Sequence, residues 1–101
     1  MQKRGAAPTA DDAAVLAISA LGFLAEDAPR LGRFMALTGM GPDELRSAAD
    51  APETLLAILD HLLSDESLFL VFTASKGLQP ESVAPARTAL ARSLGAETYH
   101  D

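Results

Sequence analysis

The sequence contains no cysteine and no tryptophan, and only 5% of its residues are aromatic. Without cysteine there are no disulfide bonds, no thiolate metal ligands and no cysteine nucleophile, which is compatible with a reducing cytoplasm. The few aromatic residues offer no platform on which nucleic-acid bases could stack. No uncharged apolar run approaches the roughly 18 residues of a membrane-spanning helix. Asp11 and Asp12 interrupt the alanine-rich N-terminal stretch, which argues against a secretory signal and favours the cytoplasm.

Motifs for catalysis or metal binding are also missing. The serines stand in no nucleophile-elbow motif, and the chain has no glycine-rich phosphate loop. His61 and His100 lack the regularly spaced partners that a metal site needs. His61 falls on the polar stripe of its predicted helix, four residues before Asp65, so we interpret it as a solvated side chain in a helical ion pair. We therefore expect no enzyme activity, no cofactor and no metal.

What the sequence does have is apolar residues, which make up 49% of its 101 positions, and a net charge of −6. This length and composition suit one domain with its own core. Most acidic residues fall at predicted helix starts, where a carboxylate caps free amides and meets the positive end of the helix dipole. We therefore ascribe the negative charge to helix capping and not to a surface for a basic partner. These acids are Asp11, Asp12, Asp27, Asp43, Glu44, Asp50, Glu53, Asp65, Glu66 and Glu81.

The apolar periodicity predicts an all-α fold, a compact bundle of five or six helices. After a disordered tail over residues 1–8, the first helix begins at Thr9 with Asp12 in a capping-box position. Its predicted inner face repeats at helical spacing, and Leu16 and Phe23 widen it; the repeating residues are Ile18, Leu21, Leu24 and Ala25. A second helix ends at Gly39, and a short third helix follows Gly41-Pro42 and ends near Asp50.

The second half of the chain predicts three more helices. They cover residues 52–63, 66–76 with Gly77 as the stop, and 79–94 with Gly95 as the stop. Pro85 lies inside the sixth pattern, where it should kink the helix or split off its first turn. We expect one helical domain over residues 9–94, followed by a disordered tail over residues 95–101.

The helix signals recur at an offset of 38 residues. The matching residues are those that set helix ends and core contacts, which suggests an internal repeat of residues 9–49 and 50–94. Two related three-helix units, each resembling a helix-turn-helix, would then pack against each other. The residues that have an identical residue 38 positions later include Leu21, Leu24, Asp27, Phe34, Ala36, Gly39 and Pro42.

The two halves differ most in the fifth predicted helix. Leu68, Leu70 and Val71 stand where the first half has Arg30, Gly32 and Arg33, so residues 68–72 are apolar on every side of the helix. One interpretation is a central helix wrapped by its neighbours. The other is a helix with a spare apolar face that binds a partner or a second copy of the chain. Arg30 and Arg33 share a helix face, which is either solvated or able to hold an anion.

Residues 36–46 resemble a helix-turn-helix corner, and residues 73–83 repeat it. A recognition helix needs side chains that donate to bases and phosphates, whereas this one offers Asp43 and Glu44. The net charge of −6 also opposes a nucleic-acid partner. A DNA-binding regulator therefore remains only an alternative.

Several short stretches also resemble a known family. They are Phe23-Leu24-Ala25-Glu26-Asp27, Leu31-Gly32-Arg33-Phe34, Thr38-Gly39-Met40-Gly41-Pro42 and Gly77-Leu78-Gln79-Pro80-Glu81. In this order they resemble a set of short bacterial proteins known only as a domain of unknown function, over residues 10–94. Pro85 departs from that pattern. The resemblance implies a small cytoplasmic helical protein and carries no activity or site residue.

The function that these observations favour is a non-enzymatic protein–protein interaction or adaptor module. Its candidate surface is Leu68, Leu70 and Val71, and its partner is another protein or a second copy of the chain. The further alternative is a small anion binder that uses Arg30 and Arg33, which would need a concave pocket between the two units.

Overall fold

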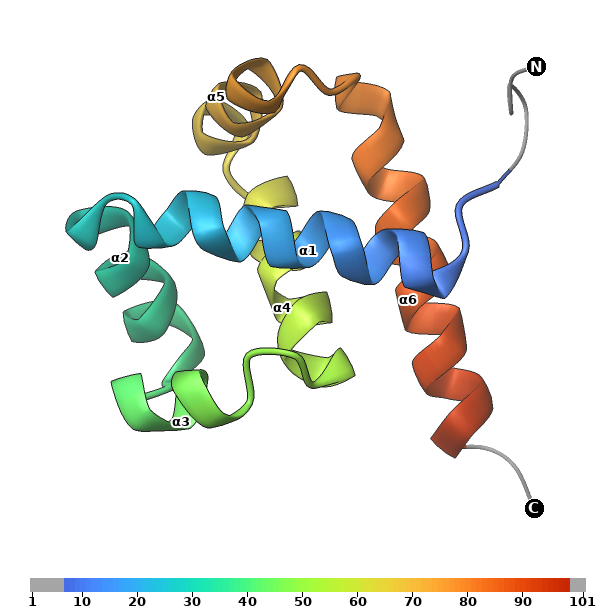
Figure 1. Ribbon diagram of the computed structural model, residues 1–101, viewed down its shortest axis with the longest axis horizontal. Helices are drawn as coiled ribbons and strands as arrows, with labels where there is room; N and C mark the ends of the chain where they lie inside the picture. The colour runs from blue at the N-terminus through green and yellow to red at the C-terminus, as the bar shows by residue number, and fades with distance from the viewer. Residues whose placement is uncertain (1–6, 99–101) are drawn as a thin grey trace.

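The computed structural model describes residues 7–98, which form six α-helices and one short 3-10 helix (Figure 1). No strand occurs in this range, so the predicted all-α bundle is confirmed. Residues 1–6 and 99–101 of the two predicted tails lie outside the described residues. The elements are α1 (Ala10–Ala25), α2 (Ala28–Thr38), α3 (Pro42–Ser47), α4 (Pro52–Leu63), α5 (Glu66–Lys76), η1 (Pro80–Ser82) and α6 (Val83–Thr98).

The helix ends follow local capping chemistry. Thr9 and Asp12 form the predicted capping box, in which each backbone N–H donates to the other side chain at 3.0 Å. Asp65 caps α5 by accepting a hydrogen bond from the backbone N–H of Leu68 at 3.2 Å. Gly39 and Gly77 end α2 and α5 in the left-handed conformation, with φ of 79° and 67°, as predicted.

The start of α6 agrees with the sequence prediction, but its end does not. Pro85 lies in the first turn of α6, where its missing N–H breaks no helical hydrogen bond. The predicted separate first turn is present as η1. The helix does not end at Gly95, because it continues to Thr98. Glycine ends a helix where the chain turns left-handed, and Gly95 has no positive φ.

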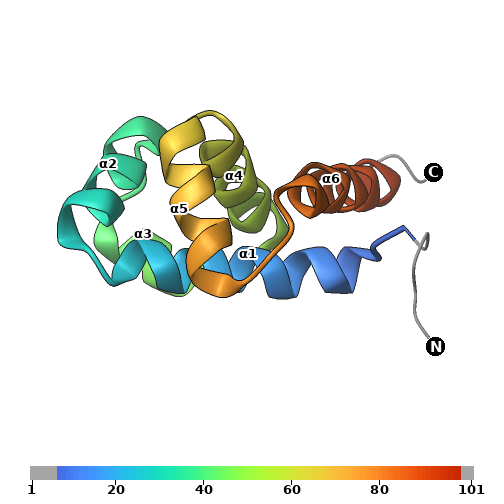
Figure 2. The same ribbon diagram turned by 90° about the horizontal axis from the view of Figure 1, so that it is seen from above.

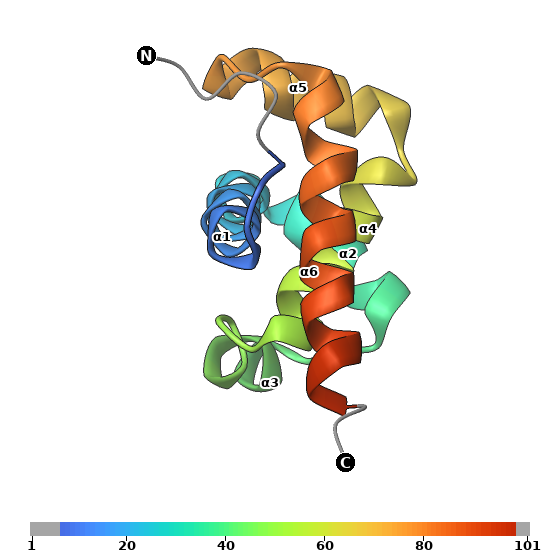
Figure 3. The ribbon, with the colours of Figure 1, turned by 90° about the vertical axis from the view of Figure 1, so that its right-hand side faces the viewer.

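The helices form a flat arrangement with principal extents of 39 × 38 × 20 Å. α1 lies across α4 and α6, which also contact each other (Figures 1 and 3). α2 packs against α1 and α4, and α5 packs against α4. The thin dimension leaves room for one layer of core, so several helices keep one face in contact with solvent.

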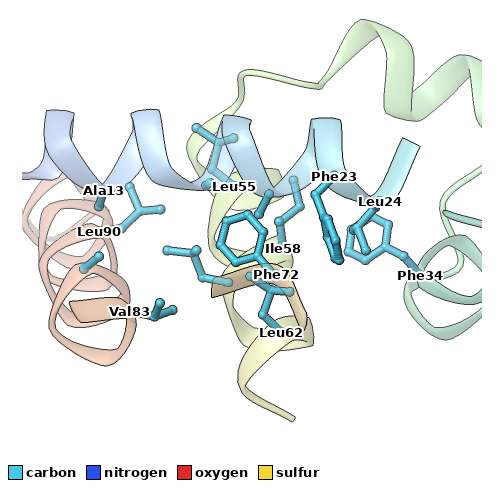
Figure 4. Close-up of a cluster of buried hydrophobic side chains, with 14 of the residues drawn as sticks. Ala13, Phe23, Leu24, Phe34, Leu55, Ile58, Leu62, Phe72, Val83 and Leu90 are labelled. Atoms are coloured by element: carbon cyan, nitrogen blue, oxygen red, sulfur yellow. The ribbon is translucent and has the colours of Figure 1, made fainter. Parts of the chain in front are cut away.

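The inner face of α1 differs from the sequence prediction. Three alanines, Ala13, Ala17 and Ala20, are fully buried there. Figure 4 shows Ala13 on the side of α1 that faces Leu90. Ile18 was expected inside, but 49% of it is exposed, and Ala25 is also exposed. A stripe of alanines lets α4 and α6 approach α1 closely, whereas larger side chains would hold them away. The rest of the core is Phe23, Leu24, Phe34, Leu45, Leu55, Ile58, Leu59, Leu62, Phe72, Val83, Ala86 and Leu90.

Residues 38 positions apart occupy corresponding places in α1–α2 and α4–α5. The rings of Phe23 and Phe72 have centroids 5.3 Å apart, and those of His61 and Phe34 have centroids 5.2 Å apart. At the offset of 38 residues, Phe23 corresponds to His61 and Phe34 to Phe72. The Phe23–Phe72 pair therefore occupies the same two positions as the His61–Phe34 pair, with the two halves of the chain exchanged. The correspondence ends after α5, because the short α3 is matched by η1 and the first turn of the much longer α6.

Candidate functional site

The N-terminal halves of α2 and α5 border an open groove of about 320 Å³. Seen from above, α2, α4 and α5 all lie on the same side of α6 (Figure 2). His61 of α4 contributes to the lining between α2 and α5. The groove therefore combines both residue sets that the sequence singled out, the arginines of α2 and the apolar residues of α5. Its lining is Asp27, Pro29, Arg30, Arg33, His61, Asp65, Ser67, Leu68 and Val71.

The two arginines of the α2 wall differ in their contacts. Nε of Arg30 lies 3.4 Å from a carboxylate oxygen of Asp27, and its guanidinium lies 4.4 Å from the ring centroid of Phe23. Arg30 is therefore held by two neighbours. Arg33 is exposed, and its side chain makes no hydrogen bond or ion pair with the side chains of residues 7–95.

Most other cations in the described chain have acidic partners. Arg46 pairs with Asp43, Lys76 with Glu26, and Arg87 with Asp60. The hydrogen bond from Arg87 to Asp60 raises the pKa of that guanidinium. Among the side chains of residues 7–95, Arg92 shares with Arg33 the lack of an ion pair, but Arg92 lies on α6 and does not line the groove. Arg33 is thus the groove's unpaired positive charge.

The α5 wall is apolar. Leu68 is half-buried and packs against the core, while 47% of Val71 is exposed. Leu70, the third predicted surface residue, is 45% exposed and lies outside the groove lining. Phe72 and Thr73 are buried on the opposite side of the helix. α5 is therefore not wrapped on all sides, and the interpretation of a fully enclosed central helix is wrong.

His61 is not the solvated side chain that the helical stripe predicted. Only 7% of it is exposed, because its ring packs edge-on against Phe34. Its Nε2 is buried and has no hydrogen-bond partner within the described chain. Burial lowers the pKa of His61, against an opposing effect of the Asp65 charge and with a smaller contribution from the Arg33 charge. The imidazole is therefore neutral near pH 7, and a neutral imidazole can donate or accept at Nε2.

A second hollow of about 450 Å³ adjoins the groove. Both hollows are lined by Arg33, His61, Asp65 and Ser67. The second adds the exposed Leu37 of α2 and the polar Ser64 and Glu66. These two adjoining hollows are here called together the α2–α5 trough. Open hollows side by side suit a segment of chain better than a compact small molecule.

The two walls of the groove are built from positions that correspond across the 38-residue offset. Asp27 corresponds to Asp65 at the two helix N-caps, and Pro29 corresponds to Ser67. Further along the helices, Arg30 corresponds to Leu68, and Arg33 to Val71. The same positions therefore provide a cationic wall on α2 and an apolar wall on α5.

Sequence reasoning missed His61 as a member of the site. The pattern of α4 alone placed it on the polar stripe. The offset provides a signal in the other direction, since His61 corresponds to Phe23, a core residue. The polar character of His61 and its correspondence to a core residue together indicate a buried polar side chain.

Among the side chains of residues 7–95, no three histidines, aspartates or glutamates gather as metal ligands would. None of the helices described is both long and apolar enough to cross a lipid bilayer.

Comparison with known proteins identifies one relationship. A family model described as "Protein of unknown function (DUF3572)" matches residues 10–93, which is most of the chain. No curated protein and no solved structure matches the chain.

Proposed function

The chain belongs to this family of proteins of unknown function, and we propose that it is a non-enzymatic module that binds a short segment of a partner protein in the α2–α5 trough. The observation that carries the proposal is the exposure of aliphatic side chains along α5. Val71 is 47% exposed inside the groove, and Leu70 is 45% exposed beside it. Apolar groups left in water next to a depression favour a site that a partner covers. The absence of cysteine is compatible with a cytoplasmic location, which we include in the proposal.

The size of the surface favours a short segment over a second copy of the chain. A stable protein interface buries about 800 Å² on each partner. The exposed apolar surface consists mainly of Leu37 and Val71 in the trough and Leu70 next to Val71 on α5, which is far less than that area. A peptide needs less surface because it inserts a few side chains into a depression.

The charges on α3 argue against the alternative of a DNA-binding regulator. α3 follows the tight corner after α2, where a recognition helix would stand. Asp43 and Glu44 are exposed there, and the cation of this helix, Arg46, lies 3.3 Å from Asp43. A helix with this charge repels the phosphates that supply most of the affinity for DNA.

The proposal is tested by selecting short random peptides for binding to the purified protein. Selected peptides should bind the unmodified chain and lose at least about tenfold in affinity to Val71→Glu. The matched control is Val15→Glu on α1, since Val15 is 69% exposed and does not line the trough. This variant should bind as the unmodified chain does.

Two outcomes would overturn the proposal. One is a selection that gives no peptide whose binding separates the two valine variants. The other is a dimer, measured by light scattering over a tenfold range of concentration, that Val71→Glu converts to monomer. The second result would assign the surface to self-association.

A further inference from the structure

Resting on the proposed function, we infer that the segment bound in the groove is a C-terminus. The geometry points to a terminal carboxylate that meets Arg33 and His61 Nε2, with the aliphatic side chain of the last residue against Leu68 and Val71.

The cationic half of this site is Arg33. A guanidinium forms paired, charge-assisted hydrogen bonds with a carboxylate. Arg33 is exposed and has no ion-pair partner among the side chains of residues 7–95, whereas Arg30 beside it is held by Asp27 and Phe23. The two acids of the groove lining are themselves engaged, Asp27 with Arg30 and Asp65 with the backbone N–H of Leu68, and a third acid, Glu66, lines the adjoining hollow. An anion at Arg33 therefore displaces no existing partner.

The second polar contact is His61. Buried polar atoms in proteins almost always have a hydrogen-bond partner, and one without a partner is costly. His61 is only 7% exposed and lines both hollows of the trough, while its Nε2 has no partner in the described chain. A neutral imidazole protonated at Nε2 would donate to a carboxylate oxygen held by Arg33.

The apolar half is the wall opposite. Leu68 and Val71 occupy the positions that correspond to Arg30 and Arg33, so one small groove has a cationic wall and an aliphatic wall. Its volume of about 320 Å³ is at the low end for ligand pockets. A C-terminal residue fits these walls because its carboxylate and its side chain are attached to the same Cα atom. An aspartate or glutamate inside a peptide would need a neighbouring residue to supply the aliphatic group.

N-acetyl-leucine is the probe that tests this inference, since it carries only the terminal carboxylate and one aliphatic side chain. Backbone amide NMR spectra of the protein would be followed during titration to about 20 mM, a range suited to millimolar affinity. We expect saturable shifts at Arg33, His61, Leu68 and Val71. N-acetyl-leucinamide, without the charge, and N-acetylglycine, without the side chain, should each bind at least about tenfold more weakly.

The variants Arg33→Gln and Arg92→Gln form a matched pair, since both residues are exposed arginines without an ion pair to the side chains described, those of residues 7–95. Arg33→Gln should abolish the shifts caused by N-acetyl-leucine, and Arg92→Gln should leave them unchanged. Equal binding of the amide probe, or equal effects of the two variants, would overturn the carboxylate inference.

The selected peptides separate failure of this inference from failure of the proposed function. Each peptide is compared with a free C-terminus and with an amidated C-terminus. Loss of affinity on amidation supports the inference. Binding that is unaffected by amidation but lost in Val71→Glu overturns the C-terminal inference and leaves the proposed function standing. If no selected peptide, with a free or an amidated C-terminus, binds in a way that depends on the trough, both the inference and the proposed function are overturned.

Discussion

The imidazole of His61 meets the ring of Phe34 edge-on, with centroids 5.2 Å apart and ring planes at 76°. The 38-residue offset relates this pair to Phe72 and Phe23, whose centroids are 5.3 Å apart. The position that holds Phe23 in the first half of the chain therefore holds His61 in the second half. Within the described residues, the histidine brings a buried nitrogen without a hydrogen-bond partner. A buried polar atom without a partner costs stability, and this one belongs to a residue that lines the groove.

His61→Phe should stabilise the protein. The substitution keeps the edge-on contact with Phe34 and removes the unpartnered Nε2. We expect the free energy of unfolding, measured by urea denaturation, to rise by about 1 kcal/mol. His61→Gln is the control, because it keeps a polar group and loses the ring, and it should lower that free energy. A lower stability for the phenylalanine variant would mean that the site cannot hold the larger ring.

The stability of the protein should depend on pH through His61. Burial lowers the pKa of this imidazole in the folded state below its usual value of 6.5. Between the lowered pKa and 6.5 the unfolded chain binds more protons, so this contribution to folding is fully present above 6.5 and falls as the pH drops. The difference in unfolding free energy between the unmodified chain and His61→Phe should therefore widen from about pH 7.5 to about pH 5.5. A constant difference would contradict the lowered pKa.

The alanine stripe of α1 should be sensitive to added volume. Ala17 is fully buried where α1 crosses its neighbours, so Ala17→Leu should lower the free energy of unfolding by about 1–3 kcal/mol. Ile18 is the next residue and faces solvent, so Ile18→Ala should change stability by less than about 0.5 kcal/mol. Thermal unfolding of the two variants gives the comparison. A larger effect at Ile18 than at Ala17 would mean that Ile18 lies on the inner face of α1, as the sequence predicted.

Two glycines of α2 should respond to alanine in opposite directions. A Cβ atom at Gly32 or Gly39 would meet no atom within 4 Å, so only the backbone matters. Gly32 lies inside the helix, where alanine is favoured, and Gly32→Ala should stabilise by about 1 kcal/mol. Gly39 has a φ of 79°, and Gly39→Ala should destabilise by about 1 kcal/mol. Equal signs in chemical denaturation would contradict the assigned helix end.

The helix boundaries were predictable because their causes are local. The capping box at Thr9 and the left-handed glycines at Gly39 and Gly77 depend on residues within one turn. The prediction at Gly95 was wrong because the sequence does not show whether a glycine adopts a positive φ.

The inner faces were harder to predict, because burial depends on the neighbouring helix. Hydrophobicity selected Ile18 for the inner face of α1, whereas close crossing by α4 and α6 selects the alanines. The predicted exposure of His61 was wrong for a similar reason, because α2 packs against α4 and Phe34 of α2 covers His61.

The residues of the groove were singled out from the sequence in two separate groups. Arg30 and Arg33 were considered as an anion site, and Leu68 and Val71 as an apolar surface. Their common groove was not predictable, since it depends on how α2 and α5 pack around α4. The 38-residue offset shows that Arg30 and Arg33 correspond to Leu68 and Val71, but it does not show that the two pairs lie close together.

The position of α6 has a consequence for how the chain folds during synthesis. α6 is the last described helix, yet it packs against α1, the first, as well as against α4 (Figure 3). Until the ribosome has made α6, the alanine stripe of α1 lacks one of the two helices that cover it. The core of the nascent chain is therefore incomplete until α6 has been synthesised. Until then part of the α1 surface stays exposed, because the α1–α6 contact joins residues that are far apart in the sequence.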